Sequence, residues 1–246
     1  MGRLEIWVHD HRDGDHQAPG PIIQTWPNSP DDPPGEDYAG WRAHYGAWHK
    51  YLEDGNPPEL IGFFAYRYYL WDPSWFPLQP HGDNVPPSGA APGWRKVPRK
   101  EFDIYRFFLS TWDGAAIKEQ LAHCDILQSA PITVGNGNII TDFERNCGCA
   151  HDGHALAVTV QKYGWDKFAG DKIYHWILIT HWPIFDRMMR EMEPLRLELH
   201  DECKGLICSN PHYRKRIMDY VMERVYPLWL LKSGLNFKEI IQLRSD

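Results

Sequence analysis

An almost unbroken run of apolar and aromatic residues at positions 60–70 constrains the fold more than any other segment. Such a run is typical of a β-strand that is buried on both faces of a sheet. Arg67 lies near its end, and a buried guanidinium must be paired or must leave the core at the strand terminus. Two interpretations are open. Arg67 pairs with a neighbouring carboxylate, or Arg67, which is flanked by Tyr66 and Tyr68, binds an anion.

Strand-like and helix-like segments alternate along the chain. We expect strands at residues 5–9, 21–26, 60–70, 125–128 and 174–180, a hairpin or loop at 133–141, and helices at 37–52, 101–108, 115–124, 151–163, 183–192 and 211–231. This order predicts an α/β fold with a mostly parallel central sheet, flanking helices and a helical C-terminal part. We assign residues 1–182 to a core and residues 183–246 to a helical region packed on it as one functional unit.

The helix expected at residues 37–52 shows the clearest periodicity. Apolar and aromatic residues recur at steps of three and four, which predicts one buried stripe. Its members are Tyr38, Trp41, Tyr45, Trp48 and Leu52.

Charge and composition exclude several functions. The net charge is −7 and no basic stripe is visible, so a nucleic-acid partner is not expected. No apolar stretch approaches the roughly 20 residues that a membrane span needs, and the first residues lack the apolar core of a signal peptide. Five cysteines, an odd number, favour reduced thiols. We therefore expect a soluble, cytoplasmic protein.

Common cofactor and nucleophile motifs are absent from the sequence. We find no G-x-G-x-x-G after the first strand, no phosphate-binding G-K-[ST] and no G-x-S-x-G. Neither a flavin nor NAD is therefore expected.

The loop after the first strand holds the densest group of possible metal ligands. His9, Asp10 and His11 begin a stretch with three histidines and three aspartates up to residue 16. Such ligands suit Mg or Mn, or zinc, if their geometry converges. The alternative is a solvated acidic turn. His11 is the preferred member because it lies just beyond a strand end, where ligands bind.

Two later segments carry further candidates for binding. His151 lies at a helix N-terminus, a natural place for an anion, although capping or surface roles compete. In the last helix, Arg216 and Glu223 share a face roughly two turns apart, and Arg224 follows. A structural ion pair is one interpretation. If this face points inward, the three charges can bind sugar hydroxyls and phosphate.

These segments together resemble a family of compact bacterial glycosyltransferase-like proteins, common in capsule and surface-polysaccharide gene clusters. Its mark is a block reading about I-G-x-x-H-Y-R-R-Y, matched here from Ile61 to Tyr69. The order and spacing of several further blocks also match over nearly the whole chain. The matching positions include His11, Gln24, Tyr45, Trp48, Asp125, His151, Arg216, Tyr220, Glu223 and Arg224.

The chain also departs from the family pattern. Ala65 stands where the block has His, Ala155 replaces an Asp, and Asp219 replaces a Gly. If the missing His and Asp handle an acceptor in the transferases, acceptor chemistry is in doubt here. The resemblance implies a GT-A-like fold that binds a nucleotide sugar with a divalent metal, Mg or Mn.

The resemblance extends to a branch of flavin-free, metal-dependent mutases that interconvert pyranose and furanose forms of GDP-sugars. Our first hypothesis is such a mutase, acting on a GDP-hexose of the GDP-fucose or GDP-galactose type. The alternative is a glycosyltransferase that moves a hexose from an NDP-sugar to a polysaccharide or natural-product acceptor. A non-catalytic nucleotide-sugar-binding module is the third.

Each hypothesis gives the same residues a task. Arg67 and Arg224 neutralise the diphosphate, and Tyr66 donates a hydrogen bond to a phosphate or ring oxygen. Glu223 binds sugar hydroxyls. The metal or phosphate shell consists of His9, Asp10 and His11, and the remaining substrate-binding candidates from the resemblance are Gln24, His151, Arg216 and Tyr220.

Overall fold

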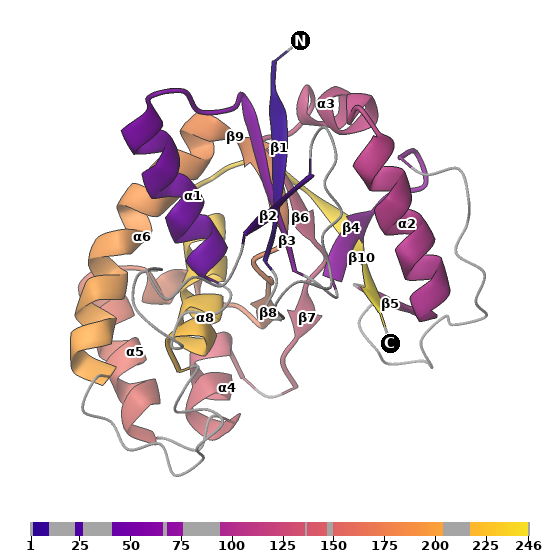
Figure 1. Cartoon of the computed structure of the whole chain (residues 1–246). Coiled ribbons are helices and arrows are strands. Elements are labelled where there is room, and N and C mark those ends of the chain that lie inside the picture. The colour runs from indigo at the N-terminus through magenta and orange to yellow at the C-terminus, as the bar shows by residue number, and fades with distance from the viewer. Residues whose placement is uncertain are drawn as a thin grey trace.

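The computed structural model describes residues 2–9, 23–26, 41–65, 68–75, 94–135, 137–146, 150–203 and 217–245. Its strands are β1 Leu4–His9, β2 Ile23–Trp26, β3 Leu60–Ala65, β4 Tyr68–Trp71, β5 Trp94–Val97, β6 Ile126–Ser129, β7 Ile132–Thr133, β8 Lys172–Ile173, β9 Leu178–His181 and β10 Phe237–Ser245. Its helices are α1 Trp41–Asp54, α2 Arg99–Thr111, α3 Ala115–Leu121, α4 Ile139–Asn146, α5 Ala150–Lys162, α6 Trp182–Cys203 and α8 Ile217–Lys232, with a short 3-10 turn at Asp166–Phe168. Figure 1 shows helices on both sides of a central sheet, so the α/β class is confirmed.

The sheet is mixed, and not mostly parallel as predicted. Within the described residues, β1 runs parallel to β2 and β3, and β10 runs parallel to β5 and β6. Four other pairings are antiparallel: β3 with β4 and β9, β6 with β9, and β10 with β4. An apolar run predicts that a strand is buried, but it does not encode the direction in which the strand runs.

The apolar run at residues 60–70 forms two strands, and the prediction of a single strand was wrong. β3 ends at Ala65, β4 begins at Tyr68, and these two residues are antiparallel partners. The run contains no Pro, Asn or Asp, and its one glycine lies inside β3, so no turn residue signals the end of the strand. Both strands are nevertheless largely buried, as the run predicted.

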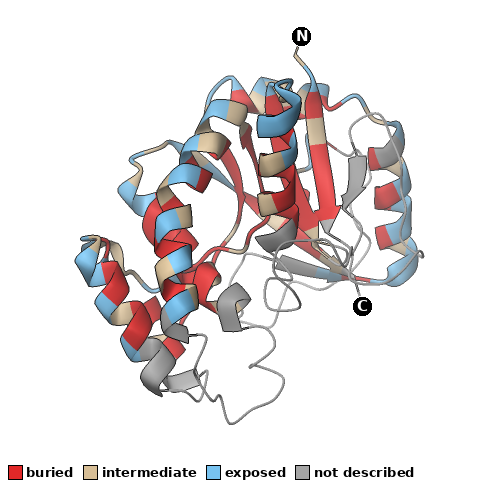
Figure 2. Ribbon diagram, turned by 60° about the vertical axis from the view of Figure 1, so that its left-hand side comes forward, coloured by how far each residue is buried: buried red, intermediate tan, exposed pale blue. Residues whose placement is uncertain are grey.

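Two apolar cores flank the sheet, and alternate strand residues supply them. Ile61 and Phe63 of β3 face the core under α1, α5, α6 and α8, while Leu60 and Phe64 face the core under α2 and α3. This division is visible as buried segments on both sides of the strands (Figure 2). Strand burial on both faces explains why the sequence shows runs and not alternation.

Gly62 lies in the middle of β3, opposite Ile6 of β1 and Ile179 of β9. A Cβ added there would lie 2.9 Å from Ile179 Cγ1 and 3.2 Å from Ile6 Cγ1. Glycine therefore allows both isoleucine side chains to close over β3 in the second core. This close approach is a steric requirement for glycine inside a strand.

Helix α1 turns a different face inward from the one predicted. Its fully buried residues include Ala43, His44, Ala47 and Tyr51, whereas Leu52 is 42% exposed. Trp48 is buried as predicted. Two of these buried residues are alanines, whose small side chains fit between the helix and the sheet. A search for large apolar residues at helical spacing does not detect them.

The C-terminal part contributes more than helices. After α6 and α8, β10 pairs with β4, β5 and β6 and so belongs to the same sheet as the N-terminal strands. Helix α4 takes up the last three residues of the segment expected as a hairpin or loop at 133–141, because Asn138 Oδ1 accepts hydrogen bonds from the amides of Ile140 and Thr141 and caps the helix. None of the described helices is long and apolar enough to cross a membrane.

Candidate functional site

The carboxyl ends of the parallel strands meet at one edge of the sheet. His9, the last residue of β1, pairs with Ala65 at the end of β3, and Ala65 pairs with Tyr68. Tyr68 in turn pairs with Arg244 near the end of β10. Ser129, at the end of β6, lies on the same side because β6 is parallel to β10. This is the edge where ligands bind in open α/β sheets.

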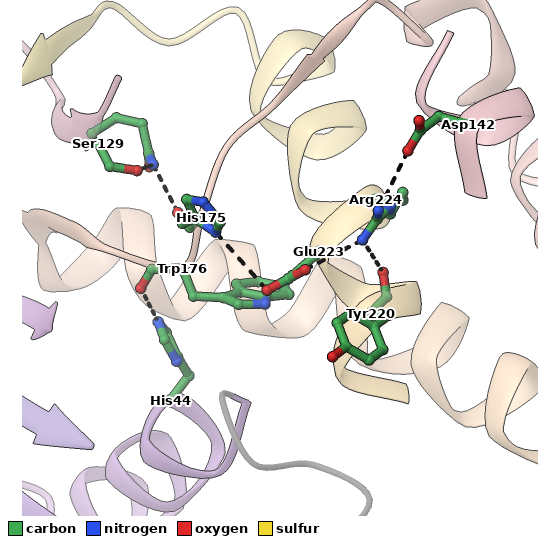
Figure 3. Close-up of polar contacts among 9 residues, drawn as sticks. His44, Ser129, Asp142, His175, Trp176, Tyr220, Glu223 and Arg224 are labelled. Carbon is green, nitrogen blue, oxygen red and sulfur yellow. Dashed lines mark hydrogen bonds and ion pairs between the residues drawn. The ribbon is translucent and has the colours of Figure 1, made fainter. Parts of the chain in front are cut away.

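A chain of polar side chains lies along this edge. The ring of His175, in the segment before β9, stacks near that of Tyr68, with centroids 6.2 Å apart and 18° between planes. His175 Nδ1 is 4.0 Å from Glu223 Oε1, and Glu223 Oε2 is 3.2 Å from Arg224 Nη1. Arg224 Nη2 is 3.5 Å from Asp142 Oδ2 of α4 (Figure 3). We name Tyr68, His175, Glu223, Arg224 and Asp142 the edge cluster.

The sequence of α8 explains where two of these charges lie. Apart from Glu223, residues 221–230 are buried, so this part of the helix is surrounded by protein and has no solvent-exposed face. The Arg224 side chain is only 10% exposed, and its guanidinium lies 5.5 Å from the centre of the Phe143 ring. A buried guanidinium requires such carboxylate and aromatic partners.

The edge cluster contains two carboxylates that share one arginine partner. Glu223 and Asp142 both face the guanidinium of Arg224, and their side chains are 18% and 13% exposed. A second guanidinium, that of Arg244, lies 5.4 Å from the centre of the Tyr68 ring, so cations and carboxylates both border the cluster. Carboxylate oxygens accept hydrogen bonds from sugar hydroxyls, whereas they repel phosphate.

Buried polar side chains fix the backbone under His175. Gln128 Nε2 donates to the His175 carbonyl at 2.8 Å, and the Tyr226 hydroxyl donates to Gln128 Oε1. On the next residue, His44 Nε2 lies 3.1 Å from the Trp176 carbonyl oxygen (Figure 3). Burial raises the pKa of Tyr226 well above its usual value, so this hydroxyl remains a donor. The loop before β9 is therefore held at two successive carbonyls.

The structure brings some predicted residues together and leaves others outside the described residues. Tyr220, Glu223 and Arg224 lie on α8, and the Tyr220 carbonyl accepts from Arg224 Nη1 at 3.2 Å. His9 ends β1 and His151 lies in the first turn of α5, but their side chains are not among those described. Gln24 is in β2 opposite Trp7, and its side chain is also not among those described. Five predicted residues lie outside the described part: Asp10, His11, Tyr66, Arg67 and Arg216.

Sequence reasoning did not identify His175 or Asp142. His175 interrupts an otherwise apolar segment between Ile173 and Ile179, and that interruption was an available signal. Asp142 has no comparable signal, because its partner Arg224 is 82 residues away in the chain. Only the packing of α4 against α8 brings them together.

The metal prediction is untested by this structure. Among the described side chains, no group of three or more His, Cys, Asp or Glu is arranged to hold a metal ion. The predicted ligands Asp10 and His11 and the side chain of His9 do not belong to that set.

Comparison with known proteins identifies the fold. No protein-family model matches the chain, and no curated protein matches it. Among solved structures, the apo structure of the bifunctional glycosyltransferase WbbM is similar over 99% of this chain, with a TM-score of 0.74 and 17% sequence identity. The match spans 45% of the WbbM chain, which is less than half its length. The chain therefore has a glycosyltransferase-like, mixed α/β fold.

Proposed function

We propose that the chain is a glycosyltransferase that moves a hexose from a nucleotide sugar to a hydroxyl acceptor. The observation that carries this proposal is the likeness of 99% of the chain to a structure named as a glycosyltransferase. The mutase hypothesis loses its first place, because no feature of the fold or of the comparison favours a GDP-sugar mutase. It becomes one outcome of the experiment below.

The edge cluster supports a division of the site into two parts. Arg224 is already paired with Glu223 and Asp142, so a diphosphate would have to displace a carboxylate to reach it. We therefore assign the diphosphate to Arg67, with Tyr66 as a donor, and the sugar hydroxyls to Glu223. Fixed positive charge stabilises the diphosphate as it leaves the anomeric carbon. Arg224 then holds Glu223 in place and does not touch the phosphate.

The metal belongs to the same proposal. We assign Mg or Mn to His9, Asp10 and His11, where it would supply further positive charge to the departing diphosphate. The remaining predicted residues, Gln24, His151, Arg216 and Tyr220, are proposed to bind parts of the nucleotide sugar.

The experiment is product analysis with a small set of donors. The purified chain is incubated with GDP-fucose, GDP-mannose or UDP-galactose, with Mn²⁺ or with EDTA, and with or without a mixture of methyl glycosides. Glycosylated acceptor found by mass spectrometry, together with free nucleoside diphosphate, supports the transferase. A furanose nucleotide sugar formed without acceptor supports the mutase and overturns the proposal. No product from any donor also contradicts it.

Arg67→Ala provides the residue test. We expect loss of turnover in this variant, because no guanidinium then faces the leaving diphosphate. Arg190→Ala is the matched control, since Arg190 is 59% exposed on α6 and pairs with Asp186 of the same helix. Unchanged turnover in Arg67→Ala would remove Arg67 from the site.

A further inference from the structure

His175 is an unusual side chain for its place in the chain. Its neighbours Tyr174 and Trp176 are 2% and 6% exposed, whereas the imidazole is 29% exposed. The segment therefore turns one polar ring out of an apolar layer, at the edge where the strands end. Core packing does not account for it, because nearly a third of the side chain is exposed.

The backbone at His175 is held from below by two buried polar side chains. Gln128 is fully buried and its amide donates both to the His175 carbonyl at 2.8 Å and to Ser129 Oγ at 2.9 Å. His44 is 2% exposed, and its ring stacks on Phe63 at 3.9 Å. With its backbone held in this way, the imidazole has little freedom beyond its own two torsions.

The imidazole nitrogens keep their capacity for hydrogen bonds. Within the described residues, the nearest acidic group is Glu223 Oε1, 4.0 Å from Nδ1, which is beyond hydrogen-bond distance. The flat face of the His175 ring lies beside the Tyr68 ring. The Glu223 carboxylate is held in turn by Arg224. A carboxylate and an imidazole on a fixed backbone thus lie side by side at a partly exposed place.

We propose that Tyr68, His175 and Glu223 form a subsite for the hydroxyls of a hexopyranose ring. Glu223 accepts hydrogen bonds from sugar hydroxyls, His175 donates to or accepts from a further hydroxyl, and Tyr68 supports the imidazole by stacking near it. The Glu223 carboxylate, 18% exposed beside His175, suits this ligand because sugar hydroxyl groups donate hydrogen bonds and carry no charge. This inference rests on the proposed function and names which described residues recognise the sugar.

The ring bound here can belong to the donor or to the acceptor, and titration calorimetry separates the two. One arm compares GDP-fucose, GDP-mannose and UDP-galactose with GDP and UDP, and the other uses methyl glycosides with GDP or UDP present. For a donor sugar, His175→Ala weakens nucleotide-sugar binding about tenfold, the value of one lost hydrogen bond of about 1.4 kcal/mol, and leaves the nucleoside diphosphate unaffected. For an acceptor sugar, the tenfold loss appears only with the methyl glycosides.

Three further variants guard this test. His175→Gln retains a hydrogen-bonding group and is expected to recover part of the lost affinity, which a purely structural role would not predict. Glu223→Gln should weaken binding of the same ligands, donor or acceptor, as His175→Ala does. His181→Ala is the matched control, because His181 is also partly exposed but lies at the opposite end of β9, beside Leu60. Thermal melting of every variant shows whether the fold is retained.

The results distinguish this inference from the proposed function. Sugar-dependent binding that His175→Ala weakens, without transfer in any assay, supports the subsite and contradicts the transferase. Full transfer and unchanged sugar affinity in folded His175→Ala overturn the subsite and leave the transferase standing. A wild-type chain that binds no sugar, in either arm, overturns the subsite.

Discussion

Substitution of Gly62 by alanine tests whether the sheet is packed as closely as the structure shows. The added methyl group would lie 2.9 Å from Ile179 Cγ1, 3.2 Å from Ile6 Cγ1 and 3.3 Å from the Leu178 carbonyl oxygen. Carbon atoms that are not bonded rest about 3.5–4.0 Å apart. Ile6 and Ile179 are fully buried, so neither side chain can move into solvent.

The expected effect of Gly62→Ala is a loss of about 1–2 kcal/mol in the free energy of unfolding. An extra methyl group in a packed core costs roughly 1–3 kcal/mol. Replacing glycine inside a strand returns roughly 0.5–1 kcal/mol of backbone entropy, because Gly62 has no left-handed φ to preserve. The steric cost therefore exceeds the entropic gain.

Urea unfolding of a double-mutant cycle measures this effect. Ile179→Ala removes the nearest atom and leaves a cavity, so in that background the Gly62→Ala methyl group should be neutral or stabilising. The coupling of about 2 kcal/mol would far exceed the roughly 0.5 kcal/mol scatter of independent sites. Gly135→Ala is the control, since an added Cβ there meets no atom within 4 Å. An equal cost of Gly62→Ala in both backgrounds would refute the steric argument.

Two further stability predictions follow from buried or paired polar groups. Tyr226→Phe removes the donor to the buried Gln128 Oε1, and we expect urea unfolding to show a loss of about 1–3 kcal/mol. Burial alone would raise the pKa of Asp72, but its hydrogen bonds and the Lys238 ammonium at 3.2 Å bring the net pKa below its usual 3.8. The Asp72 carboxylate therefore stabilises the fold at neutral pH, and this contribution disappears as the pH falls through the lowered pKa. Asp72→Asn should be less stable than wild type at pH 7 and approach it below pH 3.8; a deficit independent of pH would contradict the ion-pair argument.

Local patterns predicted the elements whose signals are local. β1 and α5 lie close to their expected bounds, since short apolar segments and a 3.6-residue period depend only on neighbouring residues. The reversal between β3 and β4 and the entry of β10 into the sheet depend on strand partners far away in the chain. No spacing within the sequence specifies those partners.

The same distinction applies to the candidate site. Glu223 and Arg224 were predicted together with Arg216 because they share one helix, and Tyr220 was added by the family resemblance. The structure places Tyr220, Glu223 and Arg224 together on α8. His175 and Asp142 join them only through the packing of other elements on α8. A sequence can therefore indicate the site residues that share one helix and miss those that other elements bring to it.

The buried polar groups below His175 are themselves an argument for function. Gln128 and His44 lie inside an apolar core, where each polar atom must be satisfied to avoid a desolvation cost. An apolar side chain at either position would avoid that cost but would not hold the carbonyls of His175 and Trp176. What the two contacts achieve is a fixed backbone position for the residue that carries the partly exposed imidazole. Ligand recognition needs such a fixed group, because binding then loses less conformational entropy.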